Sequence, residues 1–224
     1  MRFPSETLAF LRAVRANNDR EWFHAHKRDY EQFYVEPAKA FVEEAGRKLR
    51  SFIPGIRAES RILGSIFRIN RDVRHAQEDR PYKDHIDFWF WEGERARAVS
   101  GLFTRLSPDF VGIGAGCHGF DKERLPVFRE SVADPASGRA LARAAAEIEE
   151  QGYQLSGEGY KRYPKDYHSD GPASRFLLFK ALYVHVDEPV RIAVEEGAMI
   201  EACVRQWRAL APLHRWITRH VQKV

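Results

Sequence analysis

The hydrophobic period of this chain changes twice, and those changes limit the fold to a few arrangements. Before residue 50, apolar side chains recur every three or four residues, which is typical of helices that pack by one face. Between residues 65 and 117 the pattern alternates, as in a half-buried sheet, and from residue 121 the helical spacing returns. This order of helices, strands and helices predicts an α+β fold.

The alternating region contains several short strand patterns with turn residues between them. We expect strands over residues 65–71, 85–91, 99–106 and 109–117, and a later strand within 177–186. We expect helices over residues 5–16, 18–33, 37–49, 121–133, 136–151 and 190–206, and a last helix that ends near 221. Short connections within 85–117 favour antiparallel pairing. The prediction is one α+β domain over 1–224, with N-terminal helices, a central, mainly antiparallel sheet and C-terminal helices.

Composition narrows the class of protein. The chain has 224 residues, of which 44% are hydrophobic, enough for a core. It lacks the run of about 18 apolar residues that a membrane span needs, so no membrane partner is expected. Its two cysteines are too few for a disulfide framework or a cysteine metal cage, which indicates a reduced, cytoplasmic protein. A net charge of +4 is too small to indicate nucleic-acid binding by itself.

Two helix starts can be expected near the N-terminus. Ser5 is a candidate cap for the helix over residues 5–16. Asn18, followed three residues later by Glu21, has the form of a capping box. We therefore expect Asn18 to cap the second helix.

The glycine-rich stretch at 114–119 matches the dinucleotide-binding pattern G-x-G-x-x-G. That pattern functions inside a β-α-β unit, whereas here helix follows helix, so no dinucleotide cofactor is expected. Gly112, Gly114 and Gly116 alternate along one strand. One face of this strand can therefore approach a ring, another backbone or a ligand closely.

Histidines and cysteines do not form a convincing metal site in the sequence. His85 and Asp87 share one face of a predicted strand, but local spacing supplies no third ligand. Cys117 lies in an apolar alternation, which predicts a buried and inert thiol. We therefore predict no metal and no cofactor.

The stretch from Arg68 to His85 is the preferred functional site. Its fixed cations are Arg68, Arg71, Arg74, Arg80 and Lys83, and its acids are Asp72, Glu78, Asp79 and Asp84. The excess of one positive charge is too small for a simple basic patch. We therefore expect particular arginine side chains to bind the ligand through their planar guanidinium groups. Guanidinium groups at Arg71 and Arg74 suit a phosphate or carboxylate, with Asp72 orienting one of them.

This interpretation assigns roles to specific residues and leaves two alternatives open. The ligand-binding candidates for a small anion are Arg68, Arg71, Arg74, Tyr82, Lys83 and, from a second cationic run at 161–165, Lys165. The catalytic candidates are Asp72 and, where the second helix packs over the loop, Glu21 and His26. The first alternative is an arginine–carboxylate network that only stabilises the fold. The second, less favoured, is nucleic-acid binding, with Trp89 and Trp91 stacking on bases.

Three blocks of the chain resemble the uncharacterised bacterial and fungal family DUF2461. They are Asn-Asn-Asp-Arg-Glu-Trp-Phe at 17–23, Arg-Asp-Val-Arg at 71–74 and Pro-Tyr-Lys at 81–83. The family usually continues after the second block with Phe-Ser-Lys-Asp-Lys-Thr, so two family lysines are Gln77 and Asp79 here. The resemblance implies an α+β domain and carries no activity with it. It supports a site at the positions that keep their identities, namely Arg71, Asp72, Arg74, Tyr82 and Lys83.

Overall fold

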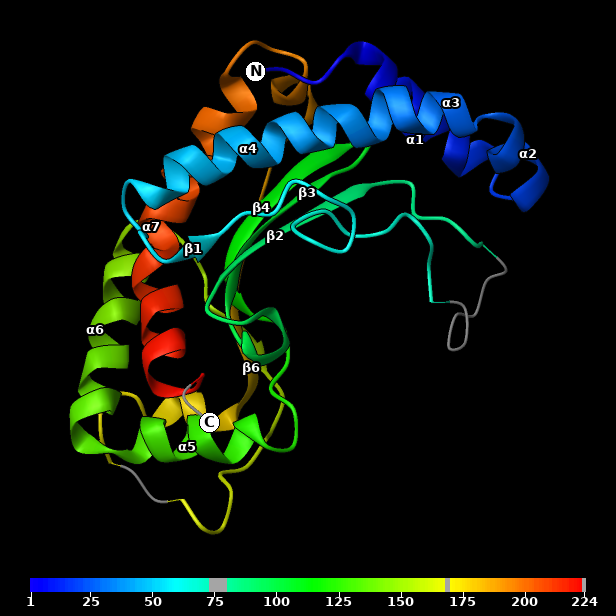
Figure 1. The fold of residues 1–224 in the computed structure, drawn as a ribbon. Helices are drawn as coiled ribbons and strands as arrows, with labels where there is room; N and C mark the ends of the chain where they lie inside the picture. The colour runs from blue at the N-terminus through cyan, green and yellow to red at the C-terminus, as the bar shows by residue number, and fades with distance from the viewer. Residues whose placement is uncertain (73–79, 168–169, 223–224) are drawn as a thin grey trace. The chain divides into compact units, whose positions relative to one another are not determined.

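Residues 1–72, 80–167 and 170–222 are described by a computed structural model (Figure 1). The predicted class is confirmed, because helices precede and follow a six-stranded antiparallel sheet. The strand order is β1-β2-β3-β4-β6-β5, so the last two strands in the chain are exchanged at one edge. No helix of the described residues is long and apolar enough to cross a membrane.

The helices and strands follow the predicted order closely. The strands are β1 (Ile56–Arg57), β2 (Ile86–Glu92), β3 (Gly101–Leu106), β4 (Phe110–Cys117), β5 (Ser156–Glu158) and β6 (Phe179–Pro189). The N-terminal helices are α1 (Ser5–Ala16), α2 (Arg20–Ala25), α3 (Lys27–Asp29), the π-helical turn η1 (Tyr30–Val35) and α4 (Glu36–Arg50). The later helices are α5 (Arg124–Ala133), α6 (Pro135–Glu150) and α7 (Ala198–His220), with short 3-10 turns η3 (Arg95–Arg97), η4 (Ser174–Leu178) and η5 (Val190–Ala193).

The chain divides into two compact units, each assembled from three segments. Unit 1 comprises Met1–Phe90, Phe103–Ile113 and Asp187–Arg205. Unit 2 comprises Trp91–Leu102, Gly114–Val186 and Gln206–Val224. The single domain expected from the sequence stays a prediction.

Aromatic packing forms the core of unit 1. Along β2, Ile86, Phe88 and Phe90 are buried, while Asp87 and Trp89 between them are partly exposed, as the alternation predicted. The alternation fails at Trp91, which was expected on the face of Asp87 and Trp89 but is buried. The ring of Phe88 lies 4.6 Å from that of Phe41 on α4, and such aromatic pairs add about 0.5–1.5 kcal/mol to the burial itself. The strand is thus held by its inner face, so its outer face is available for polar groups.

Both predicted helix caps are wrong. Pro4, whose side chain makes no cap, precedes α1, and the Ser5 hydroxyl donates to Glu6 instead. Asp19, and not Asn18, caps α2 by accepting from the Trp22 backbone N–H at 2.8 Å. Asp is as good a cap as Asn, so a start one residue later costs little. The shift leaves the Asn18 amide free to bind elsewhere.

The strand predicted over residues 65–71 is an extended segment with only isolated bridges. It pairs with β2 through the Phe67 N–H to the Asp87 carbonyl and the Trp89 N–H to the Ser65 carbonyl, both at 3.0 Å. Ile66 and Ile69 are buried, although they are three residues apart. That interval breaks the two-residue period of a strand.

The two C-terminal helices predicted after residue 190 are also wrong. The turn η5 is followed by a single helix, α7, which continues through Pro212. Proline removes one hydrogen bond from a helix. Leu210, Ala211 and Leu213 are fully buried around it, and this apolar packing offsets the lost bond.

Gly116 shows the close backbone approach expected of the glycine stretch. Its φ is +122°, a value that side chains of L-residues rarely allow. A Cβ placed there would lie 2.2 Å from the Leu182 carbonyl oxygen on β6. Glycine is therefore needed for β4 and β6 to lie together at this point.

Replacing this glycine should destabilise the protein. We expect Gly116→Ala to lower the free energy of unfolding by about 1–3 kcal/mol, because the backbone is strained and the methyl group meets a carbonyl. Urea denaturation measures this. Gly119→Ala is the matched control: no described atom lies within 4 Å of a Cβ placed there, so we expect a change within about 0.5 kcal/mol. Equal effects of the two substitutions would contradict the packing described here.

Candidate functional site

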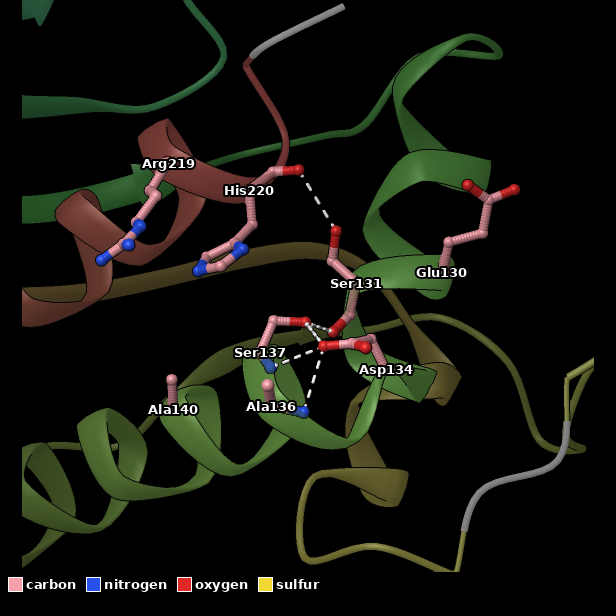
Figure 2. A pocket seen from close by; sticks show the side chains of 8 residues that line it. All are labelled: Glu130, Ser131, Asp134, Ala136, Ser137, Ala140, Arg219 and His220. Atoms are coloured by element: carbon pink, nitrogen blue, oxygen red, sulfur yellow. Dashed lines mark hydrogen bonds between the residues drawn. The ribbon is translucent and has the colours of Figure 1, made fainter.

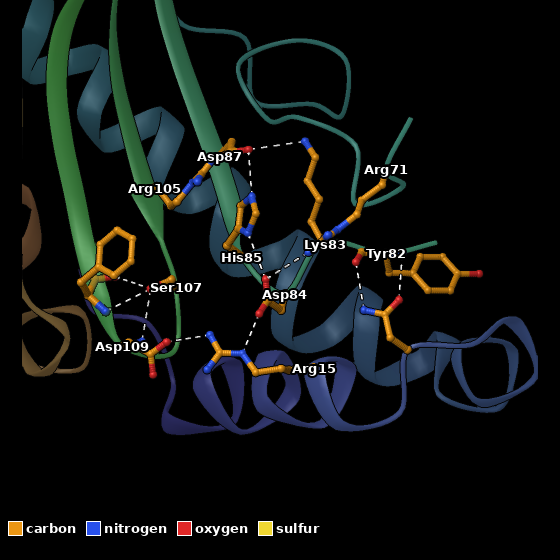
Figure 3. Close-up of polar contacts among 12 residues, drawn as sticks. Arg15, Arg71, Tyr82, Lys83, Asp84, His85, Asp87, Arg105, Ser107 and Asp109 are labelled. Carbon is orange, nitrogen blue, oxygen red and sulfur yellow. Dashed lines mark hydrogen bonds and ion pairs between the residues drawn. The ribbon is translucent and has the colours of Figure 1, made fainter. Parts of the chain in front are cut away.

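Within unit 1, ion pairs connect α1 to Asp84, two residues before β2, and to the β3–β4 turn (Figure 3). Arg15, in the last turn of α1, bridges two carboxylates. Its Nε lies 2.6 Å from Asp84 Oδ2 and its Nη2 lies 2.7 Å from Asp109 Oδ2. The turn that presents Asp109 is fixed by Ser107, whose hydroxyl accepts from the backbone N–H groups of residues 109 and 110. Arg15 therefore joins the helix to two places on the sheet.

Asp87, on the outer face of β2, gathers three cationic or donor groups. Arg105 Nε on β3 lies 2.7 Å from Asp87 Oδ1. On the other oxygen, His85 Nε2 lies at 3.3 Å and Lys83 Nζ at 3.4 Å. The side chain is mostly buried, so these partners compensate for the loss of water around a charged group.

His85 stands between the two aspartates. Its Nδ1 lies 3.2 Å from Asp84 Oδ1, while its Nε2 faces Asp87. The sequence placed His85 and Asp87 on one strand face, and this contact confirms it. We call the following set the β2 cluster: Arg15, Asp84, His85, Asp87, Arg105 and Asp109.

The ionisation of the β2 cluster follows from these contacts. Burial alone would raise the pKa of Asp87, but the hydrogen bonds from His85 and Arg105 outweigh it and hold the pKa well below its ordinary value. Burial opposes Arg15 and His85 in the same way at Asp84, and the net pKa is again lowered. Asp109 and Asp84 raise the pKa of Arg15. The carboxylates of Asp84, Asp87 and Asp109 are therefore ionised at neutral pH, where they can accept hydrogen bonds but cannot donate them.

Arg71 lies beside this cluster with a weaker contact. Its Nη2 is 3.8 Å from Asp84 Oδ1, beyond hydrogen-bond distance, whereas Arg15 holds the same carboxylate at 2.6 Å. About a third of the Arg71 side chain, 32%, is exposed. Asp84 is already occupied by Arg15 and His85, so Arg71 keeps donors that Asp84 does not use.

Lys83 and Arg68 are the other two cations of this part of unit 1. The Lys83 ammonium is 5.2 Å from the centroid of the Phe67 ring, and Phe67 is 37% exposed. Arg68 is exposed on the neighbouring position of the extended segment. Backbone bonds hold the two sides together, from the Arg71 N–H to the Pro81 carbonyl and from the Lys83 N–H to the Ile69 carbonyl, each at 2.8 Å.

Tyr82 is buried against α2. It is only 5% exposed, and its ring stacks on Phe23 of α2 with centroids 4.1 Å apart. The Asn18 amide donates to the Tyr82 carbonyl and accepts from the Tyr82 N–H. Figure 3 shows the Tyr82 ring turned away from Asp84 and Asp87. These contacts attach α2 to the Pro-Tyr-Lys segment through apolar and backbone groups.

Of the acid–base candidates on the second helix, His26 has a local partner and Glu21 is exposed. His26 stacks on Trp22 with ring centroids 4.1 Å apart, and its Nδ1 donates to the Trp22 carbonyl at 2.8 Å. Glu21 is exposed on α2. The helix does pack against the loop end, as the prediction required, but through Phe23.

Three predicted residues remain, and they belong to other parts of the chain. Asp72 is exposed, at the end of the described segment. Arg74 lies outside the described residues. Lys165 belongs to unit 2. The sequence analysis did not predict three members of the cluster, Arg15, Arg105 and Asp109. The signal that could have identified them is a charged residue near the end of an element that reaches the same end of the sheet.

Two other chemical predictions can be compared with the structure. Burial raises the pKa of the Cys117 thiol to about 11, and the residue is buried, which confirms an inert thiol. Over the described ranges, no group of three or more histidine, cysteine or acidic side chains could hold a metal ion.

Trp91, one of the two rings considered for base stacking, is only 1% exposed. The guanidinium of Arg95 lies 4.7 Å from its ring centroid. Trp89 is partly exposed. Trp91 therefore does not offer a free ring face to a base.

An open pocket of about 510 Å³ lies in unit 2, between the ends of α5, α6 and α7 (Figure 2). Several polar groups that line it bind one another. Asp134 caps α6 by accepting from the backbone N–H groups of Ala136 and Ser137. The Ser131 hydroxyl donates to the His220 carbonyl at 3.2 Å. These bonds hold helix ends, so we assign them a structural role.

The lowered pKa of Asp87 makes a testable statement about acid stability. A depressed folded-state pKa contributes stability that is complete above the ordinary value of 3.8 and is lost as the pH falls through the folded value. We expect Asp87→Asn to lower the free energy of unfolding at pH 7 by about 3 kcal/mol, because three donors lose a buried charge. The variant should also lose less stability than wild type below about pH 5.

Chemical denaturation at a series of pH values measures both effects. Asp109→Asn is the matched control, since that carboxylate is exposed and has one partner, Arg15. It should have a much smaller effect at pH 7. Wild-type and Asp87→Asn proteins with parallel stability curves between pH 7 and pH 3 would contradict the proposed ionisation.

One of three comparisons with known proteins found a match. The family model described as "Conserved hypothetical protein (DUF2461)" matches residues 6–216. No curated protein and no solved structure matches the chain. The match covers nearly the whole sequence, including both the β2 cluster and the residues around Arg71. The chain therefore belongs to the DUF2461 family.

Proposed function

We propose that unit 1 binds a small phosphorylated or carboxylated anion at the edge formed by Arg68, Arg71 and Lys83. Arg71 is the principal donor, and Lys83 adds a point charge beside it. The Phe67 ring, which Lys83 approaches, forms the apolar side of the site. Tyr82 acts indirectly, by attaching this edge to α2.

The observation that carries the proposal is that three side chains approach the Asp84 carboxylate at unequal distances. Arg15 and His85 contact this carboxylate at 2.6 and 3.2 Å, whereas Arg71 remains at 3.8 Å. A guanidinium presents five N–H donors in a planar fork that matches an oxyanion. An incoming phosphate or carboxylate can therefore accept two bonds from Arg71 without displacing the pairs of the β2 cluster.

The charge balance supports an anionic ligand over a cationic one. The fixed cations at this place are Arg15, Arg71, Lys83 and Arg105, and the carboxylates are Asp84, Asp87 and Asp109. The excess is one positive charge, before Arg68 is counted. The pKa values of Asp84 and Asp87 are lowered by partners other than Arg71. Both carboxylates are therefore charged, and those partners balance their charge.

The proposal is for binding, without a reaction. His26 and Glu21 stay candidates for proton transfer, but His26 uses its Nδ1 on its own helix. A cytoplasmic, reducing setting is part of the proposal, and it is supported by two buried free thiols, Cys117 and Cys203.

Thermal unfolding with added anions tests the proposal. We use inorganic phosphate, pyrophosphate and citrate as probes. At a probe concentration of about 100 Kd, linkage stabilises the folded state by about 2.7 kcal/mol. That corresponds to a rise in Tm of about 5–10 °C for a chain of 150–250 residues. We expect wild type to show such a rise with at least one probe, and Arg71→Ala to lose it.

The control separates binding from stability. Arg57→Ala removes another exposed arginine of unit 1, on β1, and should keep the full rise. Without probe, Arg71→Ala should change the free energy of unfolding by less than about 0.5 kcal/mol. No rise for wild type, or an equal rise in Arg71→Ala, rejects the proposal. A large loss of stability in Arg71→Ala favours a purely structural network.

A further inference from the structure

A second cationic place exists in unit 2, where the run at 161–165 lies. This run follows Tyr160, which is held by its own N–H and that of Gly159, both donating to the Leu178 carbonyl. Arg129 of α5 and Lys180 of β6 approach the Tyr160 ring from other parts of the unit. Each charged group lies 4.8 Å from the ring centroid. Two cations therefore share one aromatic ring.

The route of the Lys180 side chain shows that this arrangement is built into the backbone. A Cβ placed on Gly159 would lie 2.7 Å from both Cγ and Cδ of Lys180. The stem of the lysine thus passes over the glycine, and a side chain at position 159 would require the lysine to move. Arg129 is placed in addition by Tyr167, whose ring centroid lies 5.8 Å from the guanidinium.

These two cations have aromatic neighbours and no ionic ones. Among the residues with described positions, neither Arg129 nor Lys180 forms an ion pair, although Glu130, Glu158 and Asp166 are near in sequence. The Arg129 Nε is buried and has no hydrogen-bond partner among them. An unpaired donor of this kind is costly, and a bound anion near the guanidinium would offset the cost.

An exposed ring follows Tyr160 by three residues in the chain. Tyr163 is 54% exposed, one of the few large apolar side chains of the described residues to be so open. It lies between the exposed cations Lys161, Arg162 and Lys165. Interleaved tyrosines and basic residues are the arrangement that binds phosphates by charge and bases by stacking.

We propose that this surface binds a nucleotide unit, with the phosphate near Arg129 and Lys180 and the base on Tyr163. An acidic peptide would satisfy the cations but would leave the exposed ring without a role. The unit can belong to a free mononucleotide or to a single strand of nucleic acid, because both offer a phosphate beside a base. The surface lies within unit 2 and does not depend on Arg71.

Fluorescence anisotropy with a labelled uridylate strand of about 12 nucleotides tests the proposal on the full chain. We expect the wild type to bind at low salt and to weaken steeply between about 50 and 200 mM salt. Lys180→Ala should weaken binding and make the slope of log K against log salt shallower by about 0.7. Tyr163→Ala should weaken binding by about fivefold or more and leave that slope unchanged.

Two control variants locate the effect. Lys122→Ala removes an exposed lysine elsewhere in unit 2, and Arg57→Ala removes an exposed arginine of unit 1 outside the proposed anion site; both should bind as wild type does. Thermal unfolding without ligand checks that each variant is folded, and both test positions are exposed. A loss of binding in Lys122→Ala equal to that in Lys180→Ala overturns the proposal. So does an equal loss in Arg57→Ala.

Titrations of the Arg71→Ala variant with AMP and with inorganic phosphate identify the source of the unit, because this variant lacks the principal donor of the proposed unit 1 site. AMP binding as tight as that of the strand assigns a free nucleotide, whereas strand binding without AMP binding assigns a single strand. Failure of both overturns the proposal. Phosphate that binds as tightly as AMP, with Tyr163→Ala equal to wild type, also overturns it, since the ring then contributes nothing.

Discussion

The contact between Arg15 and Asp84 determines which groups of unit 1 remain available. At 2.6 Å it is the shortest ion pair of the β2 cluster. The ion pairs of Arg71 and Lys83 are longer, at 3.8 and 3.4 Å. Because Arg15 also holds Asp109, the end of α1 is tied to two points of the sheet. Asp84 then has little capacity left for Arg71. The fold thus uses one arginine for structure and leaves another, beside it, with unused donors.

The two cationic surfaces differ in how their charges are compensated. In unit 1 the cations meet carboxylates, so a ligand gains mainly from the donors of Arg71 that Asp84 does not use. In unit 2, Arg129 and Lys180 lie on the rings of Tyr160 and Tyr167, which stabilise a cation without neutralising it. The proposal for unit 2 therefore assigns base stacking to Tyr163, whereas the sequence had suggested Trp89 and Trp91.

The fold class was predictable because hydrophobic periods report directly on packing, and β2 is the clearest case. Its buried Ile86, Phe88 and Phe90 and its paired His85 and Asp87 were all expected. Helix starts were not, because Asn18 and Asp19 are nearly equal caps and the choice depends on a distant partner, Tyr82. Arg15, Arg105 and Asp109 were missed for the same reason. An ion pair between residues 69 or 94 positions apart leaves no mark in local spacing.

The central claim is that Arg15, and not Arg71, is the structural partner of Asp84. Double-mutant cycles measure this coupling directly, with Asp84→Asn combined with Arg15→Ala or with Arg71→Ala, and the free energy of unfolding as the readout. We predict a coupling of about 0.5–1 kcal/mol for Arg15 with Asp84 and less than about 0.3 kcal/mol for Arg71 with Asp84. A coupling for Arg71 equal to or larger than that for Arg15 would contradict the account, because Arg71 would then be a structural residue with no donors to spare.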